Sequence, residues 1–174
     1  GPRITSVTMV MRGPVSAITV RNNIANLNAT GANGATGFDT SDGGVGPVPT
    51  NISYYNNTVY GTGTGQFNGI TLGNAPTNIT VKNNLAYAPN ASAVNLLIGS
   101  GSSGLNASNN TANASIRTSP GFATIPSGNS LISSDFKIGS GSYAAVSGAA
   151  TPVLSDFFQT NTSLIAPDIG AVVH

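Results

Sequence analysis

Ile79-Thr80-Val81-Lys82-Asn83-Asn84-Leu85-Ala86-Tyr87 is the stretch that decides the fold, because its pattern occurs four times in the chain. Ile79 and Val81 alternate with polar residues, as in a half-buried β-strand, and an asparagine pair then precedes a second short apolar run. The other copies begin at Ile18, Ile52 and Leu105, so that successive copies are 34, 27 and 26 residues apart. Repeats of this length are typical of stacked supersecondary units. The pattern therefore predicts coils of a parallel β-solenoid, with Ile18, Ile52, Ile79 and Leu105 in one inward column.

A third strand of each coil is found nine residues before three of the four copies. It comprises Met9-Val10-Met11, Ile70-Thr71-Leu72 and Leu96-Leu97-Ile98. The first and third residues of each triplet are apolar, and we expect them to point inward. The second copy breaks this register, and its longer repeat (34 against 27 residues) predicts a loop with about seven extra residues within 31–50.

Composition supports an all-β chain of one domain. The 174 residues include 22 Gly, 10 Pro and no Trp, and no window combines helical apolar periodicity with capping signals. The fold class predicted is a right-handed parallel β-helix of about four rungs with a C-terminal closing segment. Inward Val, Ile and Leu then stabilise neighbouring rungs by burial.

The asparagine pairs have a structural and a functional interpretation. An asparagine at the same corner of every rung tolerates a left-handed backbone and predicts a ladder of amide hydrogen bonds through Asn23, Asn57, Asn84 and Asn110. The alternative is glycosylation, since nine Asn-X-Ser/Thr sequons occur. The candidates for modification are Asn28, Asn51, Asn78, Asn90 and Asn161. Because the repeat itself copies Asn-Ile-Ser/Thr, the structural interpretation is favoured.

Charge and cysteine content restrict the partners. Six Lys or Arg and five Asp or Glu give a net charge of +1, which provides no reason to expect nucleic acid or an anionic membrane surface. No segment has the apolar length of a transmembrane helix, so membrane insertion is not expected. The abundance of Thr, Ser, Asn and Gly with few charges favours an extracellular or cell-surface location, whereas the absence of cysteine fits several compartments.

The loop 31–50 contains the only metal candidate. Asp39 and Asp42 lie three residues apart beside Gly43, and two such carboxylates could ligate a hard cation such as calcium. The favoured alternative is that both aspartates form turns in a solvated loop. No other cofactor is predicted.

Different motifs follow residue 115. They are Ser119-Pro120-Gly121-Phe122, Ser134-Asp135-Phe136-Lys137-Ile138, Gly141-Ser142-Tyr143-Ala144-Ala145-Val146 and Pro167-Asp168-Ile169-Gly170-Ala171. Together with the rungs, these motifs resemble the C-terminal portion of the right-handed parallel β-helix proteins of the pectate-lyase-like superfamily, although Tyr143 stands where those proteins usually have Pro. The resemblance implies solenoid rungs over 1–115, continuing upstream in a longer parent chain, and a closing region over 116–174. It also implies a structural role for Asp168, capping backbone donors at the end of the solenoid.

The same resemblance bears on catalysis. Lyases of this superfamily carry a basic residue, and calcium or further basic groups, on the outer face of the strand before the Ile-Thr-Val copy. The outward residues expected there are Val10, Thr71 and Leu97, none of which is a base or a metal ligand. No catalytic residue is therefore predicted in this chain.

Arg21, Tyr55 and Lys82 form the candidate binding site. Each immediately precedes an asparagine pair, so the three are expected in one outward stripe that either contacts a polysaccharide or is a plain solvated face. Two functions remain open. The chain is an extracellular module with a structural, adhesive or polysaccharide-contacting role, or the C-terminal fragment of a polysaccharide lyase or related enzyme whose catalytic rungs lie upstream. The open first rung also predicts end-to-end self-association.

Overall fold

The computed structural model describes residues 6–30, 34–41, 44, 46–99, 102–110, 122, 133–142, 144–145, 147–152, 155–158, 160 and 167–171. Within these residues the chain forms eleven β-strands and one 3-10 turn, η1 (Ser133–Phe136), and no α-helix. No helix of the described residues is long and apolar enough to cross a membrane. The predicted all-β class is confirmed.

The strands wind into three complete turns and the first two strands of a fourth. The first turn contains β1 (Ser6–Met11), β2 (Ser16–Arg21) and β3 (Ile24–Asn28). The second contains β4 (Gly34–Thr40), β5 (Thr50–Tyr55) and β6 (Thr58–Thr62). The third contains β7 (Gln66–Leu72), β8 (Thr77–Lys82) and β9 (Leu85–Tyr87). The fourth contains β10 (Ala93–Ile98) and β11 (Asn106–Ser108).

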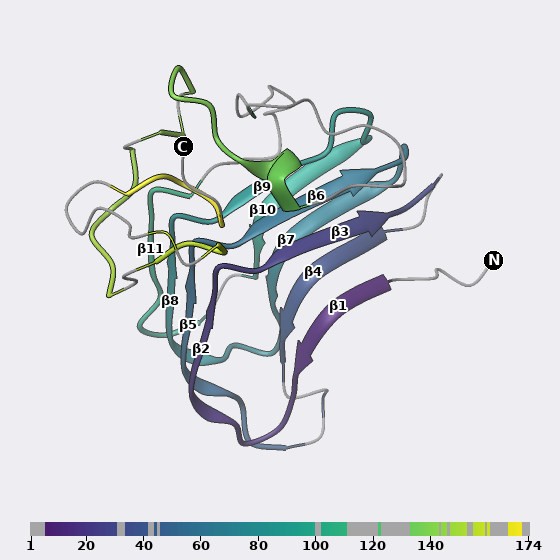
Figure 1. Ribbon diagram of the computed structural model, residues 1–174. Coiled ribbons are helices and arrows are strands. Elements are labelled where there is room, and N and C mark those ends of the chain that lie inside the picture. The colour runs from purple at the N-terminus through teal and green to yellow at the C-terminus, as the bar shows by residue number, and fades with distance from the viewer. Residues whose placement is uncertain are drawn as a thin grey trace.

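Equivalent strands of successive turns pair in parallel and make three sheets (Figure 1). Sheet A has the order β1-β4-β7-β10, sheet B the order β2-β5-β8-β11, and sheet C the order β3-β6-β9. Every pair of named strands is parallel. Because each turn contacts only its neighbours, the fold is a parallel β-solenoid, as predicted.

The interior is filled by columns of side chains that run from turn to turn. Ile18 lies opposite Ile52, and Ile52 lies opposite Ile79, so the predicted register of sheet B is confirmed. The next column holds Val20, Tyr54 and Val81, each of them buried. Burial of one such side chain contributes about 1.5–3 kcal/mol, which makes these columns the main source of stability.

The first strand of the second turn corrects the expected loop. Residues 34–40 form β4, with Phe38 opposite Met9 on one side and Ile70 on the other. Five of the seven extra residues of this repeat therefore lie after the strand, between β4 and β5, and the other two lie before it, between β3 and β4. Counting back a fixed nine residues failed because the connection between the first two strands differs in length from turn to turn. It comprises residues 12–15 in the first turn and residues 41–49 in the second.

The register of β10 differs by one residue from the prediction. Leu97, rather than Leu96, lies opposite Ile70. Leu96 is buried, and Leu97 packs partly against the core. The expected outward orientation of Leu97 is therefore wrong. The strict alternation is interrupted here, since the consecutive residues Gly69 and Ile70 in the neighbouring strand are also both buried.

The second asparagine of each pair forms the predicted ladder. The Nδ2 atoms of Asn23, Asn57 and Asn84 each donate to the Oδ1 atom of the equivalent asparagine one turn later, ending at Asn110, at 2.9, 2.8 and 3.0 Å. Each of these Oδ1 atoms also accepts the backbone N–H of the equivalent asparagine one turn earlier. Each rung of the ladder thus satisfies a buried backbone donor, which is costly to leave unpaired.

The first asparagine of each pair adopts a positive φ and faces outward to the C-terminal segment. The Nδ2 atoms of these four asparagines donate to backbone carbonyls there, and Asn83 also accepts the N–H of Ala149 at 2.7 Å. The donor and acceptor pairs are Asn22 with Ser155, Asn56 with Asp168, Asn83 with Ala149, and Asn109 with Ser147, at 2.5, 3.2, 2.8 and 2.8 Å. The corner between sheets B and C is therefore a docking strip four turns long.

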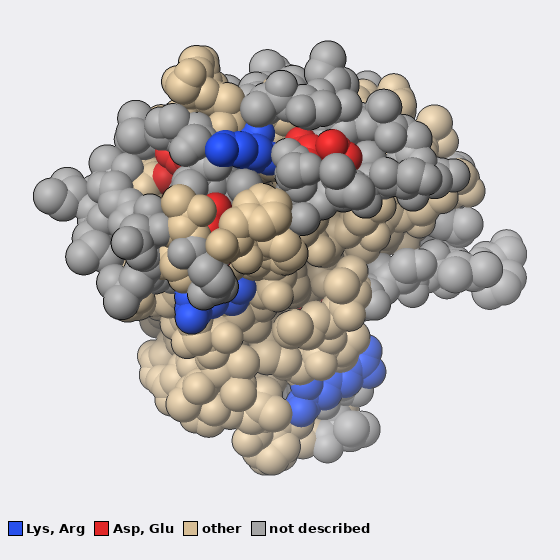
Figure 2. All heavy atoms as spheres, in the orientation of Figure 1, with Lys and Arg blue, Asp and Glu red and all other residues tan. Residues whose placement is uncertain are grey.

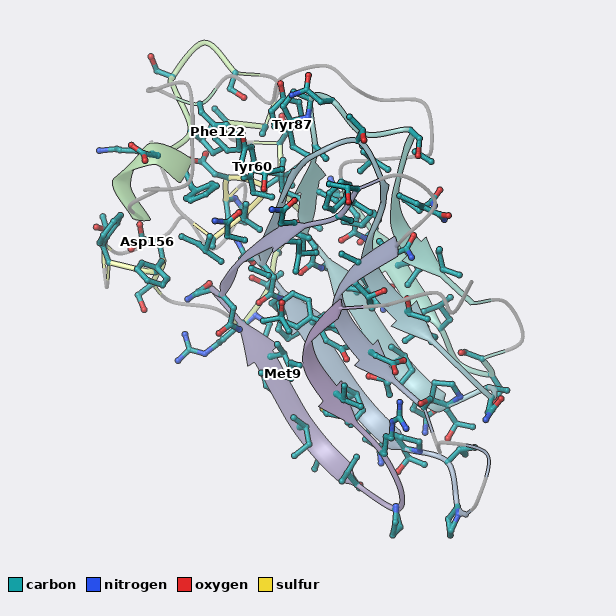
Figure 3. The ribbon with its side chains drawn as sticks, turned by 90° about the vertical axis from the view of Figure 1, so that its right-hand side faces the viewer. Met9, Tyr60, Tyr87, Phe122 and Asp156 are labelled. Carbon is teal, nitrogen blue, oxygen red and sulfur yellow. The ribbon has the colours of Figure 1, made fainter. Side chains whose placement is uncertain are left out.

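Described parts of the C-terminal segment also cover the outer face of sheet C. Tyr60 and Leu85 of that sheet are buried in a second apolar cluster, where Phe136 makes an edge contact with Tyr60 at a centroid distance of 5.4 Å. Tyr60, Tyr87 and Phe122 gather at this place (Figure 3). In Figure 1 the green and yellow C-terminal parts lie beside the turns.

This side-on docking corrects the expected place of Asp168. Its carbonyl accepts a hydrogen bond from Asn56 in the second turn, which is an interior turn of the solenoid. The next residues are held in the same way, since Gly170 donates to the Asn83 carbonyl and Ala171 to the Thr58 hydroxyl. The reason is that the outward asparagine amides offer donors along the side of the solenoid.

Candidate functional site

The outer face of sheet B carries the predicted stripe. Arg21 lies opposite Tyr55, and Tyr55 lies opposite Lys82, so the three side chains occupy one column at successive turns. Arg21 is exposed and the other two are half-buried. Ser108 continues the column in the fourth turn. Since neighbouring strands are about 4.8 Å apart, the Cα atoms of Arg21 and Lys82 stand roughly 10 Å apart, with Tyr55 on the strand between them.

A second outward column of sheet B supplies hydroxyl and amide groups. It contains Thr19, Ser53, Thr80 and Asn106 in register. The four strands of this sheet contain no carboxylate and no histidine. The two columns, which we call the contact face, can therefore donate and accept hydrogen bonds and attract anions, but they contain no histidine or carboxylate to act as a general base.

A third column of the same strands holds the left-handed residues Ala17, Asn51, Asn78 and Gly104. The Asn78 Nδ2 atom donates to the Asn51 Oδ1 atom at 3.2 Å. A Cβ atom at Gly104 would stand 2.6 Å from the Asn78 Oδ1 atom, so the glycine provides both the φ and the space that this place requires.

The sequon asparagines differ in how freely they are presented. Asn28, Asn51, Asn78 and Asn90 are all exposed, whereas Asn161 lies outside the described residues. In contrast, Asn56, which also begins a sequon, is 2% exposed. Glycosylation of the exposed asparagines stays a prediction.

The structure places one of the two calcium candidates, Asp39, in a strand and not in the expected loop. Asp39 belongs to β4, and its carboxylate lies 3.8 Å from the Arg12 guanidinium. Burial raises the pKa of the Asp39 carboxyl, and the cationic Arg12 opposes that shift. Asp42 lies outside the described residues. Among the residues that the structure describes, no three His, Cys, Asp or Glu side chains form a group that could hold a metal.

Sheet A presents the outward column that the resemblance associates with catalysis. Val10, Asp39, Thr71 and Ile98 lie in register there, so Asp39 is a carboxylate that sequence reasoning did not place on this face. Among the residues that the structure describes, its partner of opposite charge is Arg12. The signal that could have found it is the Phe38-Asp39-Thr40 alternation, which matches Ile70-Thr71-Leu72 once the fixed spacing is abandoned.

The interior of the solenoid contains a buried tyrosine, Tyr54, whose hydroxyl is polar. The Tyr54 hydroxyl is hydrogen-bonded to the Thr40 hydroxyl, and the Tyr54 ring packs against Phe38 with centroids 5.8 Å apart. Burial raises the pKa of Tyr54 to about 12, the Thr40 hydrogen bond opposes the shift, and the negative Asp39 adds to it. This group is part of the core and does not reach the contact face.

The chain matches no protein-family model, no curated protein and no solved structure. The parallel solenoid is therefore supported by strand pairing and the asparagine ladder of this chain alone.

Proposed function

We propose that this chain is an extracellular, non-catalytic solenoid whose contact face binds an acidic polysaccharide. The observation that carries the proposal is the single column of Arg21, Tyr55 and Lys82 at successive turns. The contact face has two cationic side chains and no carboxylate, which favours an anionic sugar chain. Because salt screens exposed charges, the affinity should fall as the salt concentration rises. The tyrosine ring offers an apolar surface with a polar tip, which suits the mixed surface of a sugar.

The proposal includes membership of the pectate-lyase-like β-helix proteins. Its supports are the three parallel sheets, the asparagine corner and the closing Asp168-Ile169-Gly170-Ala171 segment. In this chain the outward column of sheet A offers one carboxylate, paired with Arg12, and no second acid or base among the described residues. Polysaccharide binding without cleavage is the function that this set of groups favours.

Affinity electrophoresis in gels that contain polygalacturonate, alginate or neutral dextran tests the proposal. We expect the two anionic polymers, and not dextran, to retard the chain at low salt. The triple variant Arg21→Gln, Tyr55→Ser and Lys82→Gln should raise Kd by about tenfold or more, equivalent to about 1.4 kcal/mol. Serine is chosen because Ser108 occupies the same column in the fourth turn.

The matched control is Arg12→Gln with Lys137→Gln, which removes the same two positive charges from other surfaces. Arg12 lies after β1, and Lys137 follows η1, so neither belongs to sheet B. Equal weakening by the control and by the triple variant would show that binding depends on net charge alone and would refute the contact face. Absence of retardation by either anionic polymer would refute acidic-polysaccharide binding itself.

A further inference from the structure

The docked C-terminal segment borders the contact face in all four turns. The last residues of the four strands of sheet B form the charged column, and they are Arg21, Tyr55, Lys82 and Ser108. In each turn the next residue is the outward asparagine that donates to a carbonyl of the segment. The backbone of the segment is therefore held one residue away from the charged column, along one side of the contact face.

One part of this border carries two exposed aromatic side chains. Phe157 and Phe158 are 41% and 46% exposed, and their rings stand edge to face with centroids 5.3 Å apart. Neither side chain belongs to the two buried apolar clusters that the described residues form. Packing of the interior therefore does not account for this pair.

The loop that carries the two rings is fixed by backbone hydrogen bonds. The Asp156 N–H donates to the Thr160 carbonyl at 2.9 Å, and the Thr160 N–H donates to the Asp156 Oδ1 atom at 2.7 Å. The Phe157 N–H donates to the Ala171 carbonyl at 2.8 Å. Aromatic side chains on a fixed backbone lose little conformational entropy when they bind a partner.

The aromatic pair lies beside the first-turn end of the contact face. Asn22, the residue after Arg21, donates to the Ser155 carbonyl at 2.5 Å. Ser155 is two residues before Phe157, and two residues of chain span at most about 7 Å. Asp156, between them, is 3% exposed, so its carboxylate adds little negative charge to this surface. In Figure 3, Asp156 lies apart from the aromatic cluster that covers sheet C.

An exposed cation next to an exposed aromatic pair suits a uronic acid residue. Its carboxylate can pair with a guanidinium, and the C–H groups on one face of its pyranose ring can pack on an aromatic ring. Figure 2 shows a blue patch over the end of β2 with uncharged surface next to it. The two kinds of contact are therefore available side by side.

We propose that Phe157 and Phe158 form an aromatic subsite of the contact face, which packs on the C–H face of a uronic acid residue while Arg21 pairs with a carboxylate of the same sugar chain. The inference rests on the proposed polysaccharide binding and adds to it a contact that does not depend on charge. Salt screens the pairing of Arg21 and leaves the apolar packing of the two rings almost unchanged.

A tryptophan at the subsite reports on its occupancy, because the chain contains no tryptophan. In Phe158→Trp, an oligogalacturonate should shift the indole emission to shorter wavelength with a saturable dependence on concentration. Val10→Trp is the matched control, since Val10 is 44% exposed on the outer face of sheet A. This variant should bind the same oligosaccharide without a change in emission. Circular dichroism checks that both variants fold.

The double variant Phe157→Ala and Phe158→Ala tests the contribution of the two rings. It should raise Kd for polygalacturonate about tenfold and leave the slope of log Kd against log salt unchanged. Arg21→Gln should reduce that slope, because it removes one of the two cations of the contact face.

The outcomes separate the subsite from the proposed function. If the unmodified chain binds polygalacturonate and the double alanine variant binds it equally well, the subsite is refuted and acidic-polysaccharide binding stands. An unchanged emission of Phe158→Trp on saturation has the same meaning. Absence of binding by the unmodified chain would overturn both. Self-association that sedimentation detects in the unmodified chain, and that the double alanine variant loses, would assign the rings to a contact between copies and would also overturn the subsite.

Discussion

At the scale of single residues, the two asparagines of each corner differ in whether the side-chain amide points into the solenoid or away from it. Asn57 and Asn84 point inward and replace backbone partners that the turn cannot provide. Asn56 and Asn83 take the left-handed conformation and point outward to a distant segment of chain. One dipeptide thus closes each turn and docks the C-terminal segment.

Replacing Asn84 by Ala should lower the free energy of unfolding by roughly 1–3 kcal/mol, because the Asn57 backbone N–H loses its buried acceptor. Asn84 also accepts the Asn57 amide and donates to the Tyr54 carbonyl, so the upper part of this range is expected. Urea unfolding measures the change. Asn106→Ala, at an exposed position of β11, is the control and should stay within about 0.5 kcal/mol of the parent. An unchanged midpoint for Asn84→Ala would contradict a structural ladder.

Tyr54 predicts a loss of stability at high pH. Its pKa is about 12 in the folded chain against 10.0 for a free tyrosine, so the folded state holds the proton more tightly. The contribution is fully present below pH 10 and is lost as pH rises through 12, by roughly 3 kcal/mol in total. Urea unfolding at several pH values between 9 and 12 measures the slope. Tyr54→Phe should flatten it, and an identical slope in that variant would show that other groups cause the loss.

At the scale of elements, periodicity predicted the strands of sheet B correctly, because Ile-x-Val alternation and a fixed distance to the asparagine pair determine their register. It missed β4, whose first residues Gly34-Ala35-Thr36-Gly37 are too small to show an apolar pattern. The stripe of Arg21, Tyr55 and Lys82 followed from the same alternation.

The docking of the C-terminal segment could not be predicted in this way. Its acceptors are backbone carbonyls of Ser155, Asp168 and Ala149, and every residue type has a carbonyl. The sequence showed the asparagine pairs and predicted that their second members form the ladder, but it does not show what the first members contact. Asp39 was missed for a related reason, since its strand was taken for a loop.

At the scale of the whole molecule, stability is distributed along one axis, since each turn is held by its two neighbours. The central turns have neighbours on both sides, and their columns are closed at Ile52 and Ile79. The first turn has a described neighbour on one side only. The solenoid should therefore open from this end while its middle remains folded.

Amide hydrogen exchange on dilute, monomeric chain measures this gradient. The amides of β5 and β8 that donate between turns should exchange only through global unfolding, and both strands should report the same free energy. Amides of β1 that donate to β4 should exchange at a clearly lower free energy, because breaking them frees one strand edge and exposes side chains, such as Met9, that are already partly in water. Equal protection of β1 and β5 in the monomer would contradict nearest-neighbour stability.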